Sequence, residues 1–338
     1  MKRIWIILSL VILAAVLFPI FTKEEAAVDT KGNEPPFERL DHRFISQGKS
    51  CGAWLYLPKG TEKPPVIVMA HGFGGQRWMR LPAYAETFAK RGMAVFIFDY
   101  RGFNDSEGEP RFYINPSRHI EDWKAAIAYV RSLDSVDGNR VALWGTSFSG
   151  GHVIKVAAED QQIRAVVAQV PFTDGITTSL SYLKTPMFAL KSIYHGFLDL
   201  ILSLFSDRRH YVMISSTPEG PFGMMSTPDS LPGVQKLLGE EGQQEWSKIN
   251  RCPADIVFSL SFYRPITSAS KVSCPTLIIS AEKDSLFPPD GPVNLAAKMK
   301  QATLVSLPMG HFDPYVGELF DRLSVQMADF LAKNLGVL

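Results

Sequence analysis

Short, uninterrupted apolar runs recur along the chain, and they constrain its fold more than any other feature. Six such runs are Val66–Ala70, Ala94–Phe98, Val141–Trp144, Ala165–Val170, Thr276–Ser280 and Thr303–Leu307. A strand that is apolar at successive positions must be covered on both faces, which is typical of parallel strands. The sequence therefore predicts a mainly parallel sheet buried between helices.

The segments between these runs have helical spacing of their apolar residues. They are Leu81–Arg91, Ile120–Leu133, Phe148–Ala158 and Val293–Met299, and Phe320–Leu331 adds an amphipathic segment at the end. Strand-helix alternation indicates βαβ units with right-handed crossovers. Ahead of them, residues 44–57 have the pattern of a hairpin, with a turn at Gly48. The predicted fold class is α/β, with helices on both faces of the sheet.

One stretch of about a hundred residues interrupts this alternation. It contains an apolar segment, Phe188–Phe205, and a stretch rich in glycine and proline, Ser216–Pro232. We interpret residues 172–272 as a cap inserted over the end of the sheet. The alternative is a long excursion with no role in a functional site.

The chain begins with an apolar run, Ile4–Phe21, behind Lys2 and Arg3. As a helix this run would span about 27 Å, close to the thickness of the hydrocarbon layer of a membrane. We expect residues 1–22 to be an uncleaved signal anchor, residues 23–36 a tether, and residues 37–338 an extracytoplasmic domain. A cleaved signal peptide, which would leave a secreted or periplasmic protein, and a buried soluble helix are the alternatives.

Charge and cysteine content exclude several classes of protein. The net charge is +1, from 35 basic and 34 acidic residues, so there is no basic field to hold nucleic acid. The three cysteines, Cys51, Cys252 and Cys274, allow at most one disulfide. None of them has metal-site spacing, and no His pair does either, so we expect no metal.

Residues Gly145–Gly151 follow a predicted strand and open a predicted helix. Gly-Thr-Ser-Phe-Ser fits the nucleophile pattern G-x-S-x-G, with Ser149 in place of the second glycine. Such a turn would expose the Ser147 hydroxyl at the amino end of the next helix. The alternatives are a simple Gly/Ser-rich turn, and Ser149 as nucleophile, although its position falls inside the helix.

A serine nucleophile needs a base, and the base needs an orienting acid. Asp284 and His311 each follow a predicted strand by four residues, in the chain order Ser, Asp, His. The carboxyl ends of parallel strands are where open α/β sheets place their sites. Glu282 and Asp174 are the alternative acids.

The loop His71–Gly75 follows the first buried strand and carries three glycines. We expect the backbone N–H groups of Phe73 and Phe148 to form an oxyanion hole. His71 is expected to order the loop rather than act as a base. His42 and His119 are expected at the surface.

These motifs together resemble those of the α/β-hydrolases. His71–Gly75 is similar to the family's oxyanion loop, and Asp99–Gly108 is similar to its D-x-R-G-x-G-x-S loop, with Asn104 at a position where glycine is common. Residues 263–279 look like the bacterial branch that includes serine aminopeptidase-like, Xaa-Pro dipeptidyl-peptidase-like and dienelactone-hydrolase-like members. The resemblance covers residues from about 40 to the end of the chain, and it implies the α/β-hydrolase fold.

The residues and the resemblance together predict a serine hydrolase that needs no cofactor. Ser147, His311 and Asp284 would form its triad, and the apolar cap favours a small-molecule acyl substrate, hence a carboxylic ester. A peptidase is the alternative, with Glu240, Glu241 or Glu245 binding a free amine. The remote alternative is a membrane-tethered binding module without catalysis.

Overall fold

An eight-stranded sheet forms the centre of the protein in the computed structural model, which describes residues 34–337. The strand order is β1-β2-β4-β3-β5-β6-β10-β11. The predicted leader and nearly all of the predicted tether lie outside the described residues.

The sheet is parallel from β4 to β11 and antiparallel at its first edge. β1 and β2 form a hairpin, and β2 runs antiparallel to β4. The strands are β1 (Phe37–Ser46), β2 (Lys49–Pro58), β3 (Pro65–Ala70), β4 (Ala94–Phe98), β5 (Asp137–Thr146), β6 (Ala165–Gln169), β10 (Thr276–Ala281) and β11 (Ala302–Leu307). The six apolar runs coincide with β3 to β6, β10 and β11, so the predicted fold class is confirmed.

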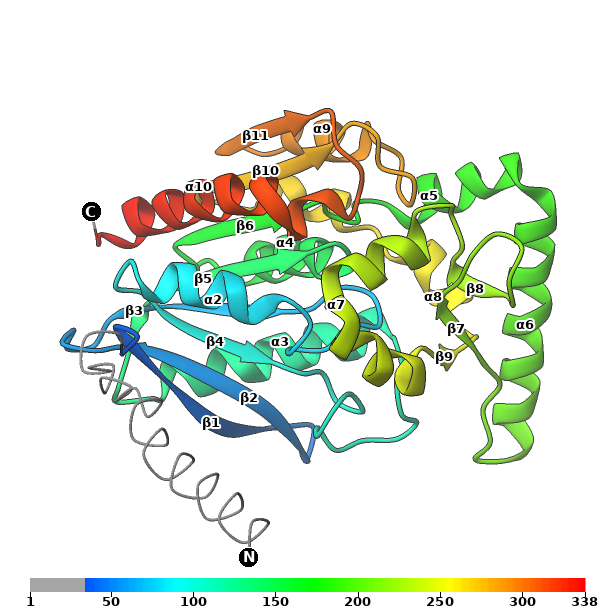
Figure 1. Ribbon diagram of the computed structural model, residues 1–338, viewed down its shortest axis with the longest axis horizontal. Helices are drawn as coiled ribbons and strands as arrows, with labels where there is room; N and C mark the ends of the chain where they lie inside the picture. The colour runs from blue at the N-terminus through cyan, green and yellow to red at the C-terminus, as the bar shows by residue number, and fades with distance from the viewer. Residues whose placement is uncertain (1–33, 338) are drawn as a thin grey trace, which may run out of the picture. The chain divides into compact units, whose positions relative to one another are not determined.

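Helices cover both faces of the sheet (Figure 1). One face carries α2 (Leu81–Ala89) and α10 (Gly317–Leu335), and the other carries α3 (Pro116–Arg131), α4 (Phe148–Glu159) and α9 (Gly291–Ala297). Successive side chains of β5 belong to different cores: Leu143 packs with the α3 side and Trp144 with the α2 side. This period of two explains why buried strands need apolar residues at every position.

The chain between β6 and β10 forms a separate layer at the carboxyl ends of the parallel strands (Figure 1). We call it the cap. Its elements are α5 (Gly175–Ser181), a 3₁₀ turn (Tyr182–Lys184), α6 (Pro186–Phe205), β7 (Tyr211–Ser215), β8 (Gly223–Met225), α7 (Ser230–Ile249), β9 (Cys252–Pro253), α8 (Ile256–Phe262) and a 3₁₀ turn (Pro265–Lys271). The three short strands form their own sheet, in the order β8-β7-β9.

The expected surface position of His119 is wrong. His119 is 1% exposed, because the side of α3 that carries it packs on α4. Its ring stacks on Tyr100 at 3.8 Å, and its Nδ1 lies 3.3 Å from His152 Nε2. His42 is half-buried, with Nδ1 at 2.9 Å from the Tyr129 hydroxyl.

All three cysteines are buried and free. Burial raises the pKa of Cys51 to about 12 and that of Cys274 to about 11. Their thiols therefore stay protonated at neutral pH and react slowly.

Candidate active site

Ser147 occupies a sharp turn between β5 and α4. Its backbone has φ 56° and ψ −121°, a conformation that a residue with a side chain rarely adopts. The neighbouring glycines permit the turn: a Cβ on Gly145 would lie 2.3 Å from Ser149 O, and one on Gly150 would lie 2.9 Å from Pro171 Cα. Backbone strain of this kind clusters at active sites and ligand-binding sites.

Ser149 occupies the position of the second glycine in the G-x-S-x-G pattern, and the turn accommodates it because its hydroxyl has a hydrogen-bond partner in the core. Ser149 Oγ lies 3.0 Å from Tyr100 Oη, which also accepts a hydrogen bond from Trp123 Nε1 at 3.0 Å. Ser149 is fully buried inside α4. Its hydroxyl is thus occupied in the core and has no access to a substrate.

The structure brings the three residues expected in the triad into one hydrogen-bonded chain. Ser147 Oγ lies 3.1 Å from His311 Nε2, and His311 Nδ1 lies 2.6 Å from Asp284 Oδ2. Ser147 follows β5, Asp284 follows β10 and His311 follows β11, so three strand ends supply them. Ser147 and His311 are 7% and 2% exposed.

The Asp284 carboxylate is fixed by the turn that follows it. Its Oδ1 accepts hydrogen bonds from the backbone N–H groups of Leu286 at 2.9 Å and Phe287 at 3.0 Å. These bonds leave Oδ2 free to face the imidazole. On the other side, the Gly310 N–H donates to Asp313 Oδ2 at 2.7 Å and orders the loop of His311.

The two alternative acids lie elsewhere. Asp174 caps α5 and accepts two hydrogen bonds from Arg264, at 2.9 and 2.8 Å. Burial opposes its ionisation, but these bonds outweigh burial and lower its pKa. Glu282 is exposed to solvent.

The loop His71–Gly75 lies against Ser147. A Cβ on Gly72 would be 2.9 Å from Ser147 Cβ, and the rings of Phe73 and Phe148 meet edge to face at 5.6 Å. Gly74 has φ +67°, and a Cβ there would strike Ile214 of β7 at 2.6 Å. The loop is therefore held between the nucleophile and the cap, and the Phe148 N–H stands at the amino end of α4.

His71 is neutral and holds this loop. Burial lowers its pKa, although Asp99 partly offsets the effect. Its Nδ1 lies 3.0 Å from Gly72 O, and its Nε2 lies 3.4 Å from Asp99 Oδ1. Asp99 also accepts the Arg77 N–H at 2.6 Å and pairs with the Arg77 guanidinium. The sequence analysis missed Arg77, because no motif marks it.

A small cavity of about 70 Å³ opens on Ser147 and His311. Its lining is mostly apolar, and the cap contributes Met225, Val234, Leu237 and Trp246. Among the described residues, no carboxylate lines it. Glu240, Glu241 and Glu245 are exposed on α7, and none of them lines this cavity. We also find no group of three His, Cys, Asp or Glu side chains within residues 34–337 that could hold a metal ion.

A second, larger cavity of about 630 Å³ lies under the first turn of α6. Met225 lines both cavities. Phe287 lines the larger one, and its ring meets that of His311 edge to face at 5.1 Å. The larger volume is of the size that small-molecule ligands occupy, whereas the smaller one holds a few atoms.

The cap is hydrogen-bonded to the turn that carries the acid. Ser285 Oγ donates to Asp229 Oδ1 at 2.5 Å, and it lies 3.0 Å from Thr227 Oγ1. Next to the histidine, a Cβ on Gly233 of α7 would strike the Phe312 ring at 2.3 Å. The cap therefore contacts the residues adjoining both Asp284 and His311.

Comparisons with known proteins bear on the family and the fold of this chain. The model of the X-Pro dipeptidyl-peptidase (S15) family matches residues 48–313. The quorum-quenching protein AidA of Acinetobacter baumannii is 39% identical over 305 residues, covering 90% of this chain and 98% of that protein. The fold is shared with the crystal structure of hypothetical protein PA2218 from Pseudomonas aeruginosa, at TM-score 0.74 and 21% identity, covering 89% of this chain and 95% of that chain. It is also shared with that of the α/β hydrolase GrgF from a Penicillium species, at TM-score 0.71 and 22% identity, covering 88% and 99%.

Proposed function

Because the chain belongs to the X-Pro dipeptidyl-peptidase (S15) family, within the α/β-hydrolase superfamily of enzymes, we propose that it is a serine hydrolase that cleaves carboxylic esters. The observation that carries the proposal is the hydrogen-bonded chain Ser147–His311–Asp284 at the ends of three parallel strands. The strained backbone of Ser147 supports it, because the turn presents the hydroxyl to the cavity.

In the first half of the reaction, Ser147 Oγ attacks the carbonyl carbon of the ester. His311 Nε2 takes the hydroxyl proton, and Asp284 holds the imidazole in the tautomer that can accept it. The N–H groups of Phe73 and Phe148 stabilise the negative oxygen, each contribution being worth about 3 kcal/mol. His311 then returns the proton to the leaving alkoxide, which departs as an alcohol and leaves an acyl-enzyme.

In the second half, water takes the place of the alcohol. His311 removes a proton from the water, the resulting hydroxide attacks the acyl carbon, and Ser147 Oγ leaves with that proton. The products are a carboxylic acid and the free enzyme. No step needs a metal or an organic cofactor.

The lining of the small cavity at Ser147 favours an acyl group over a peptide amino terminus. An aminopeptidase or dipeptidyl-peptidase needs a buried acceptor for the substrate's ammonium group. Among the described residues no carboxylate lines the small cavity, whereas Met225, Leu237 and Trp246 do. The related Penicillium protein, 23% identical over 303 residues, is named a polyketide transferase.

A peptidase remains the second candidate, because the family model that matches is that of X-Pro dipeptidyl-peptidases. Parallel assays with p-nitrophenyl esters of increasing chain length and with aminoacyl and Xaa-Pro p-nitroanilides separate the two. We expect turnover of the esters and little of the anilides. Faster turnover of an anilide would indicate a peptidase instead of an esterase. If the protein hydrolysed neither class of substrate, a binding module without catalysis would be favoured.

We further propose, from the sequence alone, that residues 1–22 anchor the enzyme with its catalytic domain outside the cytoplasm. After a carbonate wash of membranes, the full-length chain should stay in the pellet. A shortened, wholly soluble chain would instead show a cleaved signal peptide.

A further inference from the structure

The amphipathic pattern of α6 is reversed. In a water-soluble protein a surface helix buries its apolar side and exposes its polar side. In α6 the buried residues are Ser192, Gly196 and Asp199, at helical spacing on one side. Gly196 permits close packing, since a Cβ there would lie 2.4 Å from Val257 of α8.

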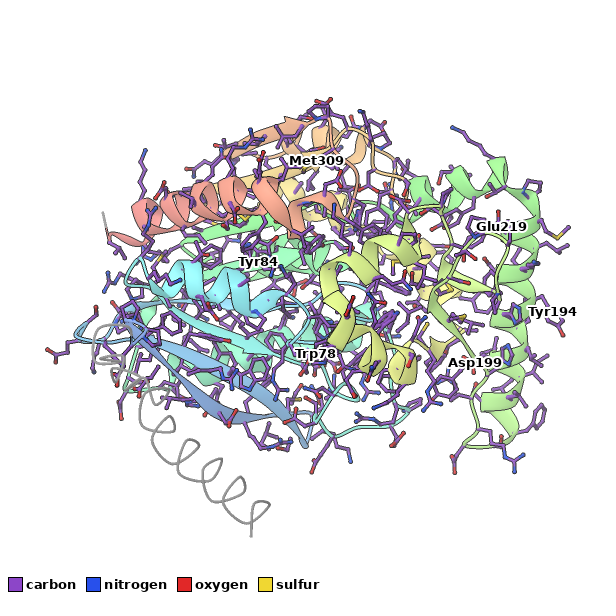
Figure 2. All side chains as sticks on the ribbon, viewed as in Figure 1. Trp78, Tyr84, Tyr194, Asp199, Glu219 and Met309 are labelled. Carbon is purple, nitrogen blue, oxygen red and sulfur yellow. The ribbon has the colours of Figure 1, made fainter. Side chains whose placement is uncertain are left out.

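The opposite side of α6 exposes large apolar side chains. They are Met187, Leu190, Ile193, Tyr194, Phe197, Leu200, Ile201, Leu204 and Phe205, and their exposure runs from 38% to 85%. Figure 2 shows Tyr194 directed away from the protein and Asp199 directed toward it. Among the described residues, α6 is the one helix long and apolar enough to cross a membrane; the mean hydropathy of its most apolar window is 1.3, with 17% of that window buried. A patch of this extent on a protein surface marks an interaction site.

One ion pair and several hydrogen bonds hold α6 on the domain along its polar side. The Asp199 carboxylate accepts hydrogen bonds from the Arg209 guanidinium at 2.9 and 2.7 Å, and from the N–H groups of His210 at 2.7 Å and Asp255 at 3.0 Å. His195 Nδ1 also lies 2.8 Å from His210 Nε2. A helix bound in this way can offer its outer side to a surface, but it cannot leave the domain to span a bilayer.

Within the segment that carries α6 the exposed charges are mainly positive, although Glu219 and Asp290 are exposed near its first turn. Within residues 183–208, Lys184, Lys191 and Arg208 are exposed and Asp207 is the one exposed acid. Basic residues beside an exposed apolar helix face suit the anionic headgroups of a lipid surface. In a symmetric pair of this chain the same cations would face one another, which opposes dimerisation through α6.

We propose that α6 docks on the surface of an anionic lipid bilayer, lying in the plane of the interface with its outer apolar side inserted to about 5–10 Å. The predicted anchor is compatible with this arrangement. Residues 23–36 can extend to about 50 Å, comparable to the diameter of a 300-residue domain. The first turn of α6 also lines the larger cavity, so docking would bring that cavity beside the lipid. The docking itself does not depend on the proposed catalysis.

The test places a fluorescent reporter on the helix in the full chain. Phe197→Cys and Leu204→Cys are labelled with an environment-sensitive dye, and Ser135→Cys, in the exposed loop before β5 at the other end of the sheet, is the matched control. The native cysteines are buried and do not compete for the label. The proteins are then reconstituted with vesicles of phosphatidylcholine and phosphatidylglycerol.

We expect nitroxide-bearing lipid to quench the dye at 197 and 204 at least several-fold more than at 135, and aqueous iodide to show the reverse order. Equal access of iodide to all three positions would overturn the proposal. Protection of 197 and 204 without lipid would also overturn it: a dependence on protein concentration would indicate a second copy, and independence from it would indicate another part of the same chain.

A second set of variants tests the two contributions to docking, which are insertion of apolar side chains and attraction between lysines and anionic headgroups. With the dye at Leu190→Cys, the triple change Ile193→Ser, Phe197→Ser and Leu204→Ser should lower partitioning of the helix by about tenfold or more for each side chain lost. The change Lys184→Glu with Lys191→Glu should raise the fraction of anionic lipid needed for docking. All five side chains are exposed, and the changes remove one aromatic contact, that of Phe197 with Phe258 at 5.0 Å, so the melting temperature should change little. Unaltered lipid quenching in the triple variant would contradict insertion of this side.

Discussion

Replacing Asp284 by Asn tests the least obvious step of the proposed mechanism, the orientation of the histidine. In the wild-type protein, Asp284 Oδ1 accepts two backbone N–H groups and Oδ2 accepts from His311 Nδ1 at 2.6 Å. An asparagine would keep its carbonyl oxygen on the two N–H groups. Its NH₂ group would then face the imidazole.

That exchange reverses the hydrogen bond. His311 Nδ1 would have to accept, so the ring proton would move to Nε2, and Nε2 could no longer take the proton of Ser147 Oγ, 3.1 Å away. The loss of a usable base should lower kcat by about 10³–10⁴, since the same exchange in a serine protease triad costs about 10⁴. At 1.36 kcal/mol per tenfold, this is about 4–5.5 kcal/mol of transition-state stabilisation.

Hydrolysis of a p-nitrophenyl ester measures the loss of kcat, and thermal unfolding shows whether the variant keeps its stability. The melting temperature should change little, because the backbone hydrogen bonds of the turn survive. Glu282→Gln, two residues away on the exposed surface, is the control and should retain full activity. A kcat of Asp284→Asn within tenfold of wild type, in a folded protein, would refute the role of this carboxylate.

Three further predictions follow from contacts around the site. Gly72→Ala should lower kcat/KM at least about tenfold, because the added Cβ would lie 2.9 Å from Ser147 Cβ and 3.1 Å from Thr146 O; an unchanged rate in the ester assay would contradict the close contact of this loop with the nucleophile. Asp229→Ala removes the acceptor of Ser285 Oγ at 2.5 Å, and it should cost less than about tenfold in kcat/KM, far less than Asp284→Asn; a larger loss would make the cap contact essential for positioning the acid. Burial lowers the pKa of His152 to about 3, whereas the unfolded chain takes up this proton near pH 6.5, so this residue alone should lower the free energy of unfolding by up to about 1.4 kcal/mol for each pH unit below 6.5, and buried His71 and His119 add to the fall; urea midpoints that rise between pH 7 and pH 5 would refute this.

The strands and the main helices could be predicted from the sequence because burial leaves a direct mark on them. A strand such as β3 is buried at every position, and no polar residue interrupts it. The cap strands left no such mark: β9 has two residues and β8 has three, too short to show a period. Their pairing depends on contacts between distant segments, which a local pattern does not record.

The apolar segment Phe188–Phe205 shows a different limit of prediction from sequence. It was predicted to belong to a cap whose apolar residues favour an acyl substrate, and the structure places it in α6 with most of its large side chains outward. Hydropathy reports how apolar a helix is, but not which side the protein covers. Here three small or polar residues decide that question, because Ser192, Gly196 and Asp199 form the buried side.

Buried polar residues were the hardest to predict. His119 has no sequence signal that separates a solvated histidine from one stacked on Tyr100. Arg77 supports the loop His71–Gly75 through Asp99, and no motif marks it. In contrast, the sequence pointed to Ser147, Asp284 and His311, because each occurs at a fixed offset from a strand and the fold brings strand ends together.

The central claim is that Ser147 is the nucleophile, and mass spectrometry of the protein treated with a fluorophosphonate probe tests it most directly. One adduct should form on the wild-type chain, and peptide mapping should place it on Ser147. Ser149→Ala should still react, because the Ser149 hydroxyl is bonded to Tyr100 in the core, whereas Ser147→Ala should not react at all. An adduct on folded Ser147→Ala, or no adduct on the wild-type protein, would contradict the account.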